Sequence, residues 1–219
     1  MNKRPSGEIL FDVALVSDTH VNEKEDFSTS PYPANGEANP RARYVFQQIN
    51  QGNAHFCIHL GDMVNPVPEL PSYIDAASNF HQLAAELTMP LHLMPGNHDI
   101  GDKPVTWMPA GMVNSEHISL YRKHFGSDYF SFNHENCHFV IINSPLINSG
   151  DPAEKEQADW LEADLASSAG KRIFLFSHYP VYVSDPSEPE SYDNIDEPGR
   201  GWLLGLIDRY KPEALFSAH

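Results

Sequence analysis

The sequence predicts an α/β fold in which parallel strands alternate with helices. Its first half contains three short apolar segments, 8–17, 55–60 and 91–94, separated by two segments with apolar residues at helical spacing. An order of strand, helix, strand, helix, strand is typical of parallel strands joined by right-handed crossovers. Each strand also stops at a turn of polar residues, and ligands of open α/β sheets gather at such strand ends.

Length and composition indicate one acidic globular domain. The chain has 219 residues, with no internal repeat and no linker, so we expect a single domain over residues 1–219. Its 30 acidic and 14 basic residues give a formal net charge of −16. Because this charge repels phosphate backbones and the basic residues do not cluster, we expect neither a nucleic acid nor an anionic membrane as a partner.

The sequence also predicts a soluble, cytoplasmic protein. No apolar segment reaches the length of a membrane span, and Asp12 breaks the run from Ile9 to Val16, which favours a strand over a signal peptide. Cys57 and Cys137 lie in apolar, strand-like segments, where we expect buried, reduced thiols. Nothing in the sequence predicts the oligomeric state.

A long loop separates the first strand from the first helix. Segment 8–17 is mostly apolar, so we expect a central strand. Loop 21–39 is polar and too long for a plain connection, which favours a functional lid or a mobile insertion. Pro40 suits the first turn of a helix that extends to about Gln51, and a second helix is expected over 72–87. The expected buried residues are Tyr44, Val45 and Ile49 in the first helix and Ile74, Ala77, Phe80, Leu83, Ala84 and Leu87 in the second.

The second half begins with another insertion, 100–114. Its large apolar residues, which would either line a substrate pocket or plug the insertion, are Trp107, Met108 and Met112. The acidic loop 184–197 lacks the spacing of a calcium-binding loop, so we expect a solvated flap. The remaining elements are expected to be helices at 115–125, 151–167 and 201–210, a hairpin of strands 129–132 and 137–142, and strands at 171–177 and 213–217.

The strand ends bring together residue types that bind metals. Five separate strands are followed by carboxylate, imidazole or carboxamide side chains, which form a mixed set of oxygen and nitrogen donors. These donors are more than one ion needs, so we expect two ions that share a bridging carboxylate. The residues concerned are Asp18, His20, Asp62, Asn97, His98, His178 and His219.

Such a site has the parts needed to hydrolyse a phosphate ester. Two metal ions bind a phosphoryl group by two of its oxygens and lower the pKa of a bridging water. A remaining imidazole can protonate the leaving alkoxide. Because imidazole and carboxylate donors occur together, we expect two transition-metal ions such as Mn, Fe or Zn, since Mg and Ca prefer oxygen donors alone.

The motifs in this order resemble those of the calcineurin-like metallophosphoesterases. The resemblance rests on Asp18-Thr19-His20, Gly61-Asp62, Gly96-Asn97-His98-Asp99, His178 and Ser217-Ala218-His219, which extend over nearly the whole chain. It implies a two-layered β-sandwich flanked by helices. It also implies that Asp18 and His20 bind one metal, that Asp62 bridges, that Asn97, His178 and His219 bind the other metal, and that His98 contacts the phosphate and acts as general acid.

Three positions depart from the family pattern. Ala218 stands where a glycine is usual, a small change that we expect to be tolerated. Asn65 stands where the protein Ser/Thr phosphatase branch has an acidic partner for the catalytic histidine, which argues against that branch. The second histidine of the last motif would lie two residues beyond His219, so we expect that the domain is truncated at its C-terminus and that the Asp18/His20 metal binds more weakly than the other.

Two functions remain open at this point. The first is an enzyme that hydrolyses a small phosphomonoester or phosphodiester, and the second is a non-catalytic metal-binding scaffold of the same fold. Scaffolds lose metal ligands or the catalytic histidine, whereas His98 and the visible ligands are all present. We therefore expect an enzyme whose partner is a small phosphate ester. The metal core is common to monoesterases and diesterases, so it does not separate them.

Overall fold

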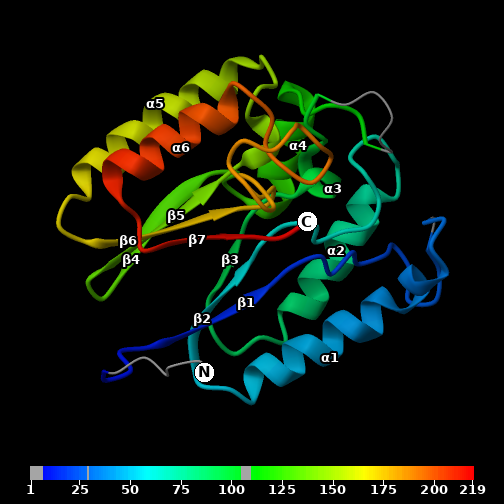
Figure 1. The fold of residues 1–219 in the computed structure, drawn as a ribbon. Helices are drawn as coiled ribbons and strands as arrows, with labels where there is room; N and C mark the ends of the chain where they lie inside the picture. Colours follow the sequence, from blue (N-terminus) through cyan, green and yellow to red (C-terminus); the bar gives the residue numbers. More distant parts are fainter. Residues whose placement is uncertain (1–6, 29, 105–109) are drawn as a thin grey trace.

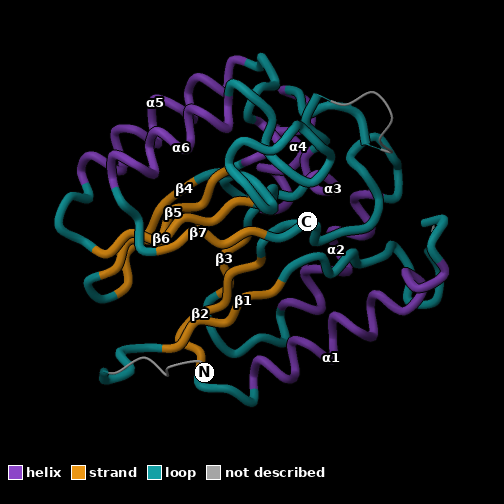
Figure 2. Tube along the Cα trace, in the orientation of Figure 1, coloured by secondary structure: helices purple, strands orange, loops and turns teal. Residues whose placement is uncertain are grey.

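The computed structural model describes residues 7–28, 30–104 and 110–219. Two β-sheets form the centre of the molecule, with helices α1 and α2 on one side and α5 and α6 on the other (Figure 1). Figure 2 shows the same layers by secondary structure, with the strands of both sheets enclosed between helices. Trp107 and Met108, which we expected in the second insertion, lie outside the described residues.

The first sheet confirms the predicted alternation of strands and helices. Strands β1 (Asp12–Val16), β2 (Ala54–His59) and β3 (Leu91–Leu93) pair in parallel in the order β1-β2-β3. Helix α1 (Ala38–Asn50) connects the first two strands and α2 (Tyr73–Ala84) the next two. The expectation of a central first strand is wrong, because β1 lies at the edge of the sheet. Its apolar side chains are explained by the second sheet, against which Phe11 and Val13 pack.

The second sheet contains β4 (Phe130–His134), β5 (Cys137–Ile142), β6 (Arg172–Ser177) and β7 (Ala214–Ser217) in that order. The predicted hairpin is present as the antiparallel pair β4-β5, and the other two pairs are parallel. Helices α5 (Pro152–Ser167) and α6 (Gly199–Tyr210) cover its outer face. Helix α5 starts as predicted, because the Asp151 carboxylate accepts a hydrogen bond from the main-chain nitrogen of Ala153 at 2.9 Å.

Three layers of buried side chains show that the two sheets form a sandwich. One layer lies beneath α1, α2 and α4 (Ser115–Phe125), and another lies beneath α5 and α6. The third lies between the sheets and includes Phe56 and Ile58 from β2 and Phe139 and Phe176 from β5 and β6. The rings of Phe56 and Phe139 meet edge to face with centroids 5.1 Å apart. The predicted two-layered sandwich flanked by helices is confirmed.

The expected buried face of α2 is confirmed except at Ile74, because the other predicted residues are buried or pack against the core. In α1 only Ile49 of the three expected residues packs against the core. Tyr44 is 62% exposed and Val45 36% exposed, whereas Phe46 is fully buried and its ring meets that of Phe80. Helix α1 begins at Ala38 after the 3₁₀ helix η1 (Pro33–Glu37), two residues before Pro40. The buried face of α1 therefore consists of the side chains that point toward α2, such as Phe46. In α2, Ile74 is 48% exposed because the neighbouring Tyr73 occupies the core.

Both cysteines are buried and carry no disulfide, as expected. Burial raises the pKa of the Cys57 thiol to about 12. Among the described residues, no helix combines the length and the apolar character needed to cross a lipid bilayer.

Candidate metal centre

The predicted ligands lie together at the carboxyl ends of the strands. Asp18 and His20 follow β1, and Asp62 follows β2. Main-chain hydrogen bonds join these two turns, from the nitrogen of Asp18 to the oxygen of Gly61 and from the nitrogen of His20 to the oxygen of Asp62, both at 3.0 Å. Asn97 and His98 lie in the short helix α3 (Asn97–Ile100), while His178 follows β6 and His219 follows β7.

The backbone of these turns is strained. Asp18, His20 and Asp62 have φ angles of 52°, 43° and 54°, in the left-handed region that side chains other than glycine rarely adopt. Each such residue costs about 1–3 kcal/mol and persists only where the surroundings hold it. Three left-handed residues among the predicted ligands are compatible with a functional site, although Glu135, Asn148 and Lys211 show similar φ angles outside it.

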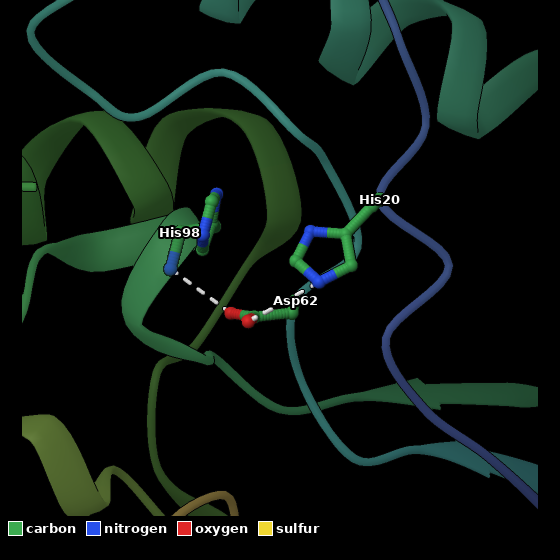
Figure 3. A group of neighbouring side chains, drawn as sticks. All are labelled: His20, Asp62 and His98. Carbon is green, nitrogen blue, oxygen red and sulfur yellow. Dashed lines mark hydrogen bonds and ion pairs between the residues drawn. The ribbon is translucent and has the colours of Figure 1, made fainter. Parts of the chain in front are cut away.

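Asp62 occupies the centre of the site. Its Oδ1 accepts a hydrogen bond from the main-chain nitrogen of His98 at 2.9 Å. Its Oδ2 lies 3.7 Å from Nε2 of His20 and 3.5 Å from Nε2 of His178. Burial alone would raise the pKa of Asp62, but the surrounding imidazoles of His178, His98 and His20 outweigh burial and hold the pKa far below its ordinary value. Figure 3 shows the carboxylate between His20 and His98.

One group of donors lies on the side of β1. The donor atoms of His20, Asp62 and His98 all lie within 4.8 Å of one another. Asp18 Oδ1 lies 3.9 Å from Nε2 of His20, at the margin of this group. His98 Nδ1 lies 2.7 Å from the main-chain oxygen of Asn65. Because a carbonyl only accepts, Nδ1 carries the hydrogen, and Nε2 of His98 is the nitrogen left for other chemistry.

A second, more compact group lies on the side of the second sheet. Nε2 of His178 is 3.1 Å from Oδ1 of Asn97, 3.3 Å from Nδ1 of His219 and 3.5 Å from Oδ2 of Asp62. His178 Nδ1 donates to the main-chain oxygen of Leu60 at 2.8 Å, which turns Nε2 into the site. His178 is fully buried and His219 partly buried.

The second group favours a positive charge at its centre. In a neutral His178 the Nε2 lone pair would face the oxygens of Asn97 and Asp62, which is repulsive. Burial lowers the pKa of His178, but the Asp62 carboxylate outweighs burial and raises it to about 9, so this position favours positive charge. Burial and the neighbouring His178 together lower the pKa of His219 to about 4. The same position therefore suits a metal cation.

The donor set fits transition-metal ions. Donors bonded to one ion at about 2.0–2.1 Å lie about 3.0–3.4 Å apart, which is close to the 3.1, 3.3 and 3.5 Å separations around His178 Nε2. Imidazole, carboxylate and carboxamide together suit borderline metals.

Asp99 of the Gly96-Asn97-His98-Asp99 motif has a structural position that the sequence does not reveal. Its side chain is fully buried and accepts hydrogen bonds from the main-chain nitrogens of Met63 and Gly96, both at 2.9 Å, and of Val64 at 3.2 Å. Burial raises the pKa of Asp99 to about 8. Asp99 thus connects the turn after β2 to the turn after β3 and fixes Asp62 relative to Asn97.

The acidic loop 184–197 is a solvated flap only in its first half. In its second half Asn194 and Ile195 are buried, which corrects the expectation. The rings of Tyr192 and His219 meet edge to face with centroids 4.4 Å apart, and the hydroxyl of Tyr192 accepts from Nδ2 of Asn97 at 3.2 Å. No periodic pattern in the sequence marks this loop as part of the site, because it contains neither helix nor strand.

The chain belongs to the calcineurin-like phosphoesterase family. The model of that family matches residues 11–219, which include all the predicted ligands. The resemblance seen in the motifs is thereby confirmed.

Similar proteins include the serine/threonine-protein phosphatase CPPED1 of Bos taurus, 27% identical over 188 residues, which cover 81% of this chain and 57% of the relative. The CPPED1 protein of Homo sapiens is 26% identical over 184 residues, which cover 79% and 56%. This chain thus spans little more than half the length of these relatives.

Two solved structures share the fold. A dimetal phosphatase from Danio rerio has a TM-score of 0.63 at 15% identity, with 96% of this chain and 81% of that chain covered. The purple acid phosphatase PPD1 from yellow lupin seeds has a TM-score of 0.62 at 19% identity, with 94% and 37% covered.

Proposed function

We propose that the protein is a metal-dependent hydrolase of phosphate esters with two metal ions in its active site. The observation that carries this proposal is the position of Asp62 Oδ2, 3.7 Å from Nε2 of His20 on one side and 3.5 Å from Nε2 of His178 on the other. A carboxylate oxygen between two groups of nitrogen donors is suited to bridge two ions. Membership of a phosphoesterase family supports the same reaction.

We assign the donors to two ions that share Asp62. Asp18 and His20 would hold the first ion, and Asn97, His178 and His219 would hold the second. When bound, the two ions supply positive charge for the phosphoryl oxygens and lower the pKa of a water between them. Mn, Fe and Zn are the candidates, because imidazole and carboxylate donors occur together.

His98 is the proposed general acid. Nδ1–H of His98 donates to the main-chain oxygen of Asn65, and the main-chain nitrogen of His98 donates a hydrogen bond to Asp62 Oδ1. Nε2 of a protonated His98 can therefore give its hydrogen to the leaving alkoxide oxygen while Nδ1 keeps its own. The imidazole of His98 lies beside that of His20, with ring centroids 4.7 Å apart, which places the acid next to the first ion's donors.

The proposed substrate is a small phosphate ester. The net charge of −16 and the carboxylates of loop 184–197 repel long polyanions, so local metal charge would admit only a compact anion. A phosphoserine or phosphothreonine side chain is a second candidate, favoured by the name of the CPPED1 relatives. With either substrate, Nδ1–H of His98 would donate to the main-chain oxygen of Asn65, because the Asn65 side chain carries no carboxylate that could accept it.

The test is hydrolysis by purified protein that has been depleted of metal and reconstituted with Mn, Fe or Zn. Phosphomonoesters, a phosphodiester and phosphoserine peptides should be compared by release of phosphate or alcohol. We expect metal-dependent turnover that Asp62→Asn abolishes and His55→Ala, a change at an exposed histidine outside the site, leaves intact. Binding of two ions per chain without turnover of any ester would favour the metal-binding scaffold instead.

A further inference from the structure

Both ends of the Asn97 carboxamide have defined neighbours. Its Oδ1 lies 3.1 Å from Nε2 of His178, while its Nδ2 lies 3.4 Å from Oδ2 of Asp102 and 3.2 Å from the hydroxyl of Tyr192. The side chain is fully buried. A carboxamide rotated by half a turn would present an NH₂ group, which has no lone pair for a metal. Some group must therefore hold the oxygen toward His178.

Asp102 is itself held in place. It is fully buried, and its Oδ1 accepts hydrogen bonds from the hydroxyl of Tyr179 and from the main-chain nitrogen of Lys103, the latter at 2.9 Å. Its main chain pairs with Gly111 and Val113 at 2.9 and 2.8 Å. Because Oδ1 is occupied on two sides, Oδ2 is the atom that faces Asn97. The Asp102 side chain is thus a fixed acceptor.

Tyr192 is fixed through its loop. The buried ammonium group of Lys103 donates to the main-chain oxygens of Ser191 and Asn194 at 2.5 and 2.7 Å, and to Oδ1 of Asp196 at 2.9 Å. These contacts hold both flanks of Tyr192. A lysine that is only 3% exposed and binds three oxygens of one loop is an anchor for that loop.

We propose that Asp102 and Tyr192 are positioning residues that hold the Asn97 carboxamide with its oxygen toward the ion shared with His178 and His219. The inference rests on the proposed metal centre, in which Asn97 is a ligand. Both residues present an oxygen that accepts from the Asn97 NH₂ group, so both favour the same rotamer of the amide. Partners of this kind behind a metal ligand typically contribute about 10–100-fold to metal affinity.

The test compares metal affinity in three full-length variants. Tyr192→Phe removes the hydroxyl and keeps the ring on His219, and Asp102→Asn keeps the shape of the side chain while weakening the acceptor. Tyr182→Phe is the matched control, because Tyr182 is 39% exposed and lies outside this network. Titration calorimetry with Mn²⁺ or Zn²⁺ should show the tighter ion bound about 10-fold more weakly in Tyr192→Phe and about 10–100-fold more weakly in Asp102→Asn, with the control unchanged.

A double-mutant cycle separates orientation of the amide from general support of the loop. Asn97→Asp replaces the amide by a carboxylate, which presents an oxygen in either rotamer, so Tyr192→Phe should cost little further affinity in that background. An equal loss in both backgrounds would overturn the proposal and leave Tyr192 a structural residue. Wild-type affinity in both Tyr192→Phe and Asp102→Asn would also overturn it. Affinity is measured without substrate, so absence of hydrolysis would count against the proposed function alone.

Discussion

Gly96 approaches Asp62 so closely that a Cβ atom at position 96 would lie 2.2 Å from Asp62 Oδ1 and 2.4 Å from its main-chain nitrogen. Asp62 Oδ1 is the atom that accepts from His98. A side chain at position 96 would collide with the Asp62 carboxylate and disturb its hydrogen bond, so this position requires glycine. The contact joins the turn after β3 to the turn after β2.

The first prediction concerns this glycine. Gly96→Ala should lower the free energy of unfolding by about 1–3 kcal/mol and weaken binding of both ions, because the backbone must move away from Asp62. Chemical denaturation and metal titration measure the two effects. Gly205→Ala in helix α6 is the control, since nothing lies within 4 Å of its Cβ position, and it should stabilise by about 0.5–1 kcal/mol. If both substitutions changed the free energy of unfolding and the metal affinity equally, position 96 would have no particular need for glycine.

The second prediction concerns Asp62, the proposed bridging carboxylate. Asp62→Asn keeps the volume of the side chain but removes its charge, so both ions should bind more than about 100-fold more weakly, beyond the range for residues behind a ligand. Elemental analysis after gel filtration gives the retained metal. A variant that still carries two ions per chain would mean that Asp62 does not bridge.

The third prediction concerns His98. His98→Ala should keep its metal and melt near the wild-type temperature, yet lose about 10²–10⁴-fold in turnover of alkyl phosphates, whose leaving groups need a proton. Aryl phosphates should lose less, since their leaving groups are already stable anions. If both ester types lose the same factor, His98 stabilises charge rather than donating a proton.

The fourth prediction is that the two ions bind unequally. The donors around His178 Nε2 lie 3.1–3.5 Å away, whereas His20 Nε2 lies 3.7 Å from Asp62 and 3.9 Å from Asp18. The compact group should fill first because less rearrangement is needed. Calorimetric titration should resolve two steps, and His219→Ala should abolish the tighter one while His20→Ala abolishes the weaker one. A single step of two equivalent ions would contradict this order.

The sequence predicted those parts of the fold that depend on local patterns. Strand ends and helices follow from apolar spacing, and the positions of Asp18, Asp62 and His178 at strand ends follow from the apolar strands before them. The edge position of β1 was missed because an apolar strand is buried equally well by neighbours in its own sheet or by a second sheet. Only the resemblance to a family indicated that second sheet.

Contacts between segments that are distant in the chain could not be predicted from the sequence. Asp102 and Tyr192 meet at Asn97 although 90 residues separate them, because Lys103 holds the loop that carries Tyr192. A lysine, a tyrosine and an aspartate in irregular segments show no periodicity that would connect them. The phase of α1 was missed for a related reason, since Phe46 is selected by the position of Phe80 on another helix.

The candidate ligands are divided between the two sheets, with Asp62 and Asn97 following strands of the first and His178 and His219 following strands of the second. A cation held by all four joins the two halves of the sandwich as a crosslink would. Separation of the sheets would then require release of the ion, so metal should raise the melting temperature of the whole domain. With free metal at 100 times its dissociation constant, the linkage adds about 2.7 kcal/mol to the free energy of unfolding.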